Sequence, residues 1–149
     1  MIKKILIPID GSQSADHALD VGLDLAGKYS AEVMVITVFD SPRPSLLAKG
    51  MLYAPASTEK YLEELSNFND RILSEALKKA IKFKPKIRVS KKLVEGRPAD
   101  KIVEIAKKEA VDLIVIGSRG LGGMKEFFLG SVSDRVADEA PCPVLIVKE

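Results

Sequence analysis

Five short apolar runs alternate along the chain with segments whose apolar residues recur at helical spacing. This alternation restricts the fold more than any other feature of the sequence. The runs are Ile5–Ile9, Val33–Phe39, Ile87–Val94, Leu113–Gly117 and Val144–Val147. Several of them are apolar at nearly every position, which is typical of strands buried on both faces. Strict alternation of strand and helix predicts a parallel sheet covered by helices on both faces.

Four segments between or after these runs have the period of an amphipathic helix. The first follows a serine cap at Ser12 or Ser14. The third has Pro98 near its first turn, where a missing N–H is harmless, and the fourth spans 131–139. The second and longest runs from about Thr58 to Ile81. Its predicted inward face consists of Tyr61, Leu62, Leu65, Phe68, Ile72, Leu73, Ala76, Leu77 and Ala80.

The length and composition predict one domain over residues 1–149, without a linker that would divide it. The proline-containing segment 41–57 is expected to be a mobile surface connection. No run approaches the roughly 20 apolar residues that cross a bilayer, and the first residues lack a signal-peptide core. Cys142 is the single cysteine, so an internal disulfide is excluded. We therefore expect a cytoplasmic protein.

The 23 basic and 21 acidic residues give a formal net charge of +2 at pH 7. Attraction to phosphate groups grows with the number of cations that neutralise them, so this sum favours neither a nucleic-acid nor a membrane partner. His17, the single histidine, falls on the outer face of the first helix, which removes Ser-His-Asp and Cys-His catalysis. No cluster of histidine and cysteine suggests zinc. The sequence thus names no catalytic residue and no metal ligand.

Five strands in this pattern predict a doubly wound sheet in the order 3-2-1-4-5, in which the first and fourth strands lie side by side. Ligands of such sheets bind at the carboxyl ends of the strands where the winding reverses. This rule selects Pro8–Ser12 after the first strand and Ile116–Gly120 after the fourth.

The connection from Ser118 to Gly130 is longer than the usual loop of about 2–6 residues between strand and helix. It is rich in glycine and leads directly into the fourth helix at Ser131. Glycine lets backbone N–H groups approach a ligand, and a helix N-terminus adds unsatisfied donors and a partial positive charge. Together they suit a phosphate. The P-loop motif GxxxxGK[ST] and the dinucleotide motif GxGxxG are both absent.

Gly117-Ser118-Arg119-Gly120, nine residues and then Gly130-Ser131 form the pattern G-x-x-G-x9-G-[ST]. With 5–12 near the start and 140–147 near the end, the chain resembles the universal stress protein family over essentially its whole length. The resemblance implies a Rossmann-like α/β fold of the adenine nucleotide alpha hydrolase-like type. Some members of that family bind ATP and others do not. The glycine pattern marks the binders, so the chain looks like an ATP-binding member.

The resemblance also implies a set of nucleotide-binding residues. They are Pro8, Asp10, Val38, Ile116, Gly117, Gly120, Gly130, Ser131 and Val132. A divalent ion, Mg²⁺ or Mn²⁺, is expected to accompany ATP through the phosphate oxygens. Family members commonly form homodimers, often through the last strand, here 144–147.

The residues leave alternatives open. Asp10 suits a contact to the ribose or to a divalent ion, a base that orients water in a hydrolase, a turn or a helix cap. Ser131 suits either phosphate binding or capping. Arg119 and Lys125 suit either phosphate pairing or solvated loop positions. At the level of function, the leading hypothesis is a stress-response regulator. Its bound ATP would change its conformation or determine which protein partner, still unknown, it binds. The alternatives are a slow or partner-dependent ATPase or phosphotransferase, and a nucleotide-free dimeric interaction module.

Overall fold

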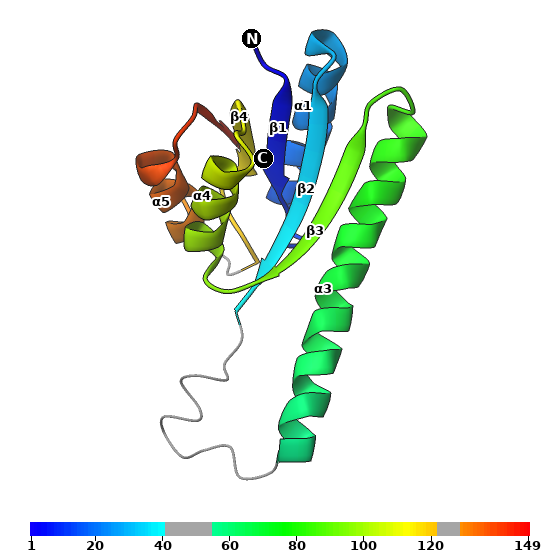
Figure 1. Ribbon diagram of the computed structural model, residues 1–149, viewed down its shortest axis with the longest axis vertical. Helices are drawn as coiled ribbons and strands as arrows, with labels where there is room; N and C mark the ends of the chain where they lie inside the picture. The colour runs from blue at the N-terminus through cyan, green and yellow to red at the C-terminus, as the bar shows by residue number, and fades with distance from the viewer. Residues whose placement is uncertain (41–54, 122–128) are drawn as a thin grey trace.

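The structure, a computed structural model, describes residues 1–40, 55–121 and 129–149. Its five parallel strands form one sheet in the order β3-β2-β1-β4-β5, which confirms the predicted fold class (Figure 1). The strands are β1 (Lys4–Pro8), β2 (Glu32–Phe39), β3 (Val89–Glu95), β4 (Leu113–Gly117) and β5 (Val144–Val147). The helices are α1 (Gln13–Tyr29), α3 (Pro55–Phe83), α4 (Pro98–Lys108) and α5 (Ser131–Glu139).

Two apolar layers hold the helices on the sheet, one on each face. Along β1 the side chains of Ile5 and Ile7 point to one layer and Leu6 points to the other, as the period of two in a strand requires. The first layer packs against α1 and α3, and the second against α4 and α5. Since all three of these β1 residues are fully buried, β1 is the central strand of the molecule.

Local sequence fixes where the helices begin. Ser12 is the N-cap of α1, and its Oγ accepts a hydrogen bond from the backbone N–H of Ala15 at 3.2 Å. Pro98 is in the first turn of α4, as predicted. Helix α3 opens at Pro55, three residues before the predicted start, because proline is well tolerated at the first helical position. The rest of the predicted connection 41–57 lies outside the described residues.

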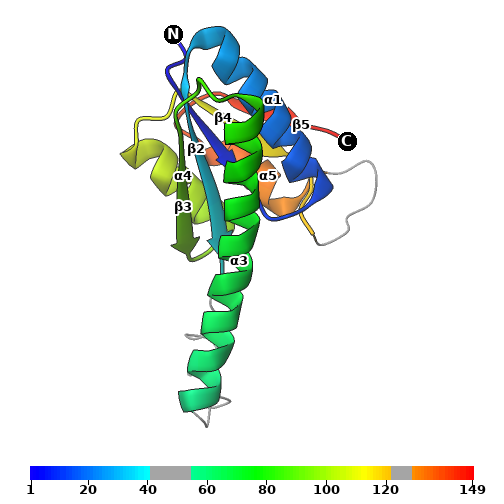
Figure 2. The same ribbon diagram turned by 90° about the vertical axis from the view of Figure 1, so that its right-hand side faces the viewer.

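Helix α3 is longer than the sheet is tall. Its 29 residues span about 43 Å, and its first half extends past the carboxyl ends of the strands (Figure 2). Tyr61 and Phe68 are 53% and 50% exposed, so the prediction that they point into the core is wrong. The helical period marks an apolar stripe correctly but does not reveal where the underlying sheet ends.

Within the described ranges, no helix is both long and apolar enough to span a membrane.

Candidate functional site

A pocket of about 360 Å³ opens at the carboxyl ends of β1 and β4, where the winding of the sheet reverses. Its volume is in the range of small-molecule sites, roughly 300–1,000 Å³. All nine site residues predicted from the sequence line this pocket: Pro8, Asp10, Val38, Ile116, Gly117, Gly120, Gly130, Ser131 and Val132. The structure therefore brings together residues from four separate parts of the chain.

One wall of the pocket is apolar. Val38 and Ile116 come from the ends of β2 and β4, and Pro98 and Ile102 come from the first turns of α4. The sequence reasoning missed Pro98 and Ile102. The sequence could have indicated both residues, because α4 directly follows β3. In this fold a helix that follows a strand begins at the carboxyl edge of the sheet, where the pocket lies. Ala15, Leu121 and Ser133 complete the lining that was not foreseen. Ile9 belongs to the segment Pro8–Ser12 that the topology selects, and Arg119 lines the pocket as one of its two alternatives requires.

The carboxylate of Asp10 connects the two loops that border the pocket. One oxygen accepts the backbone N–H of Ser12 at 2.9 Å, which closes a turn after β1. The other oxygen accepts the backbone N–H of Leu121 at 3.2 Å, across the switch point. A Cβ atom at Gly120 would lie 2.7 Å from this second oxygen, so the absence of a side chain at Gly120 lets the two loops meet.

Gly117 serves packing rather than an unusual backbone conformation. A Cβ atom there would lie 2.6 Å from Ser14 Oγ and 2.8 Å from the backbone nitrogen of Ala15, so it would run into the first turn of α1. Among the described residues, the glycines with positive φ are Gly11 and Gly96. Gly117 is not among them, and its missing side chain instead brings β4 close to α1.

Buried serines fix both sides of the glycine-rich segment. Ser14 Oγ accepts the backbone N–H of Arg119 at 3.3 Å and lies 3.4 Å from the carbonyl oxygen of Val147. The hydroxyl of Ser133 lies 3.0 Å from the carbonyl oxygens of Ser118 and Gly130, which lets it donate to either. Because Ser14, Ser118 and Ser133 are almost fully buried, these contacts are shielded from water and hold the loop ends in place.

The N-terminus of α5 faces the pocket without a capping side chain. Gly130 is the N-cap, so the alternative that Ser131 caps this helix is wrong. Ser131 and Val132 are the first two helical residues, and both line the pocket. The first N–H groups of a helix have no partner within the helix and carry a partial positive charge. This end of the pocket is therefore suited to an anion.

Gly122, Gly123 and Lys125, which belong to the glycine-rich connection from Ser118 to Gly130, lie outside the described residues. Within the residues that are described, no group of three or more histidine, cysteine, aspartate or glutamate side chains could hold a metal ion. The described pocket thus combines an apolar wall, one carboxylate and a bare helix N-terminus.

The sequence and the fold of this chain are both similar to those of known proteins. The model of the universal stress protein family matches residues 1–148. Universal stress protein MJ0531 of Methanocaldococcus jannaschii is 40% identical over 150 residues, which cover 100% of this chain and 84% of that protein. A solved structure of MJ0577, a universal stress protein from the same organism, is 33% identical with a TM-score of 0.75 and covers 100% of this chain and 97% of its own.

A third match, a universal stress protein solved in complex with cAMP, is 26% identical with a TM-score of 0.67, covering 99% of this chain and 97% of that one. The match of the family model and the identity to MJ0531 both extend over nearly the entire sequence. The chain belongs to the universal stress protein family.

Proposed function

We propose that this protein binds ATP in the pocket between β1 and β4 and that the bound nucleotide regulates its conformation or its partners in a stress response in the cytoplasm. The observation that carries the proposal is the uncapped N-terminus of α5 at one end of a pocket whose other wall is apolar. A triphosphate attached to a flat aromatic base needs these two surfaces. The related protein solved with cAMP supports an adenine nucleotide as the ligand class.

Each part of the pocket has a role in this proposal. Val38, Ile116 and Pro8 would contact the adenine and shield it from water. Asp10 would accept a hydrogen bond from the ribose. The backbone of 117–120 and 130–132 would surround the phosphates, to which N–H groups donate charge-assisted hydrogen bonds worth about 1.5–3 kcal/mol each.

A divalent ion fits the described donor set only as a companion of the nucleotide. Asp10 is a single carboxylate at the pocket, and Mg²⁺ is typically held by one or two carboxylates together with substrate phosphates. When bound, Mg²⁺ or Mn²⁺ would neutralise part of the charge of the triphosphate. The protein's own contribution would be the orientation of the Asp10 side chain by Ser12.

The hydrogen bond between Asp10 and Leu121 gives the nucleotide a way to act on the protein. A ribose hydroxyl that donates to the same Asp10 oxygen as Leu121 would share that oxygen with the Leu121 N–H or replace it. Loss of this bond would release the start of the glycine-rich segment, and a ligand shifts such an equilibrium by its different affinity for the two states. In an ATP titration we expect the amide resonance of Leu121 to move, and we expect that movement to be much smaller with adenine alone.

We further propose that the protein is a homodimer formed through β5. This strand lies at the edge of the sheet, where its outer N–H and C=O groups have no strand beside them in the described chain. Leu145 is 38% exposed on it. An open apolar edge of this kind is a common template for pairing with a second chain.

The direct test of the nucleotide site is Ser131→Glu, measured by calorimetric titration with ATP. A carboxylate in the first turn of a helix stabilises that helix by about 0.3–1 kcal/mol, so the variant is expected to fold at least as well as wild type. It should weaken ATP binding roughly tenfold to a hundredfold, because it repels the phosphates and occupies their donors. Adenosine, which has no phosphate, should bind almost as well as before.

Ser131→Gln is the matched control, since glutamine has the shape of glutamate without its charge. It should bind ATP much more tightly than Ser131→Glu does. If Ser131→Glu binds ATP as tightly as wild type, the phosphates do not lie at α5 and the proposal is wrong. A single-turnover measurement on the wild-type protein separates the regulator from an ATPase: we expect bound ATP to remain intact for minutes, and its loss within seconds would favour the enzyme.

A further inference from the structure

The basic residues of this chain are not evenly distributed. Residues 78–92 contain eight lysines and arginines and no aspartate or glutamate. The net charge of the whole chain is only +2, so the residues outside this segment carry a net negative charge. The small net charge therefore conceals a strongly basic segment, which runs from the end of α3 into β3.

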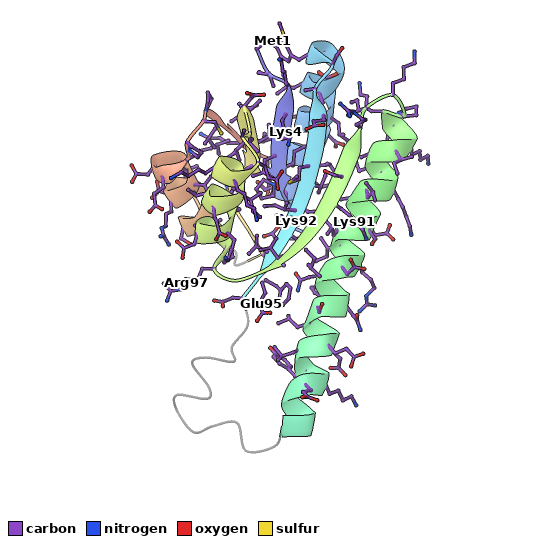
Figure 3. All side chains as sticks on the ribbon, in the orientation of Figure 1. Met1, Lys4, Lys91, Lys92, Glu95 and Arg97 are labelled. Atoms are coloured by element: carbon purple, nitrogen blue, oxygen red, sulfur yellow. The ribbon has the colours of Figure 1, made fainter. Side chains whose placement is uncertain are left out.

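The fold gathers further cations beside this segment. In a sheet of this type the helices end where the strands begin, so the C-termini of α1, α3 and α4 lie at the same edge as the start of β1 (Figure 1). Each of these three helices has lysine in its last turn. Figure 3 shows Met1 and Lys4 toward this amino edge, whereas Glu95 and Arg97 lie at the opposite, carboxyl edge.

Several contacts place these residues side by side. Lys3, Lys86 and Arg88 line one open depression of about 760 Å³ together with Gly27 of α1. Lys84 Nζ is 3.5 Å from Asp24 of α1. We call the surface formed by Lys3, Lys28, Tyr29 and residues 82–88 the amino-edge face.

Exposed apolar side chains lie among the cations of this face. Tyr29 is 51% exposed and Phe83 is 63% exposed, and Ile81, two residues before Phe83 in the chain, is 56% exposed. The ammonium group of Lys82 lies 5.6 Å from the centre of the Phe83 ring. Large exposed apolar groups next to lysines are typical of surfaces that enter the boundary between lipid headgroups and acyl chains.

Of the carboxylates at this edge, Glu32 and Glu109 are recessed, whereas Asp24 is 52% exposed beside Lys28 and Lys84. The side chain of Arg88 is 88% exposed and that of its partner Glu32 is 35% exposed. Lys28 is 67% exposed, and Glu109 is 28% exposed. A strand of nucleic acid that entered the depression would meet Glu32, Glu109 and Asp112 in its lining. A flat anionic surface would meet mainly the projecting lysine and arginine side chains.

We propose that the amino-edge face docks on the surface of a membrane that contains anionic lipids. The cations would attract the headgroups, and Phe83 and Tyr29 would insert at the level of the headgroups. The pocket between β1 and β4 lies at the opposite edge of the sheet, so it would face away from the membrane and remain open to solution.

The test is co-sedimentation of the full-length protein with vesicles of phosphatidylcholine, with and without phosphatidylserine at about one third of the lipid. The probe variant is Lys82→Gln/Lys86→Gln/Arg88→Gln. The control is Lys60→Gln/Lys91→Gln/Lys101→Gln, which removes the same charge from exposed or half-exposed positions outside the amino-edge face. All six positions are exposed or partly exposed, so both variants should fold, and circular dichroism checks this.

We expect wild type and the control to bind the vesicles that contain phosphatidylserine and to bind pure phosphatidylcholine weakly. Each lysine near an anionic surface contributes roughly a fivefold factor in affinity, so the probe variant should lose at least tenfold. Phe83→Ser should lower the binding that persists at high salt. Equal binding by the probe and control variants would overturn the proposal. Tighter binding to a DNA or RNA duplex than to the anionic vesicles at the same ionic strength would also overturn it.

Discussion

Glycines at single positions decide how closely the elements of this molecule approach one another. Gly117 has no side chain because the first turn of α1 occupies that space. At Gly22 a Cβ atom would instead meet the end of the Ile7 side chain on the underlying strand. Gly27, in contrast, has ordinary space around it, with Lys84 Nζ 3.8 Å from the position of a Cβ atom. The same residue type is thus required at some positions and dispensable at another.

Gly117→Ala is predicted to destabilise the fold by about 1–3 kcal/mol, because overpacking against a backbone cannot be relieved by a rotamer change. Gly27→Ala is the control and should stabilise the protein by about 0.4–1 kcal/mol, since alanine favours a helix and reduces the entropy of the unfolded chain. Urea denaturation of both variants measures these changes. Two variants of equal stability would contradict the packing role of Gly117.

The sequence identified Gly117 and Gly120 as site residues, but it could not give the reason for them. Both were expected to make room for a ligand, whereas the structure shows that Gly117 makes room for α1 and Gly120 for Asp10. A glycine motif indicates that a side chain is excluded at a position, but it does not indicate which neighbouring group excludes it. Pro98 and Ile102 were missed because proline is typical of the first turn of any helix and isoleucine is typical of any core, so neither residue type indicates a site.

At the scale of the elements, contacts between strand ends hold the sheet together. Asp112, just before β4, accepts the backbone N–H groups of Lys3 and Lys4 at 2.8 and 2.9 Å. These donors, that of Lys3 first, lower the pKa of the Asp112 carboxyl below its ordinary value of 3.8. Because the pKa is lower in the folded state than in the unfolded state, the ionised carboxylate stabilises the fold above about pH 4. This stabilisation is lost as the pH falls through the folded-state pKa.

Asp112→Asn is therefore predicted to lower the melting temperature at pH 7. The gap between the variant and wild type should shrink as the pH falls below 4, where wild type loses its own carboxylate. Thermal unfolding at a series of pH values measures this gap. A gap that stays constant down to pH 2.5 would show that the charge of Asp112 has no part in stability.

The edge strand β5 leads to a separate prediction. Leu145→Lys should weaken the proposed dimer about tenfold or more, because a lysine on an edge strand opposes pairing and brings two like charges together across the interface. Sedimentation equilibrium measures the dissociation constant. Tyr61→Lys, on an exposed apolar residue of α3, is the control and should leave it unchanged. A wild-type protein that is monomeric at every concentration tested would remove β5 as the interface.

For the molecule as a whole, the sequence predicted the fold class and the strand order because strand and helix patterns rarely alternate so regularly for any other reason. The carboxyl-edge site followed from the same topology. The basic face at the amino edge was not predicted. It depends on where the charged residues lie in space, and the net charge of the whole chain does not show this distribution. The sequence also did not predict that α3 extends past the end of the sheet. The helical period of a segment carries no information about the length of the strands on which the helix packs.

One carbonyl group joins the nucleotide pocket to the proposed dimer edge. The oxygen of Val147, at the end of β5, accepts the backbone N–H of Ser118 at 2.8 Å and lies 3.4 Å from the Ser14 hydroxyl, which holds Arg119 beside the pocket. A second subunit that shifts Val147 would alter the same hydrogen bonds that position the phosphate-binding backbone. Thermodynamic reciprocity then requires that, if dimer formation changes the affinity for ATP, ATP changes the dimer dissociation constant by the same factor.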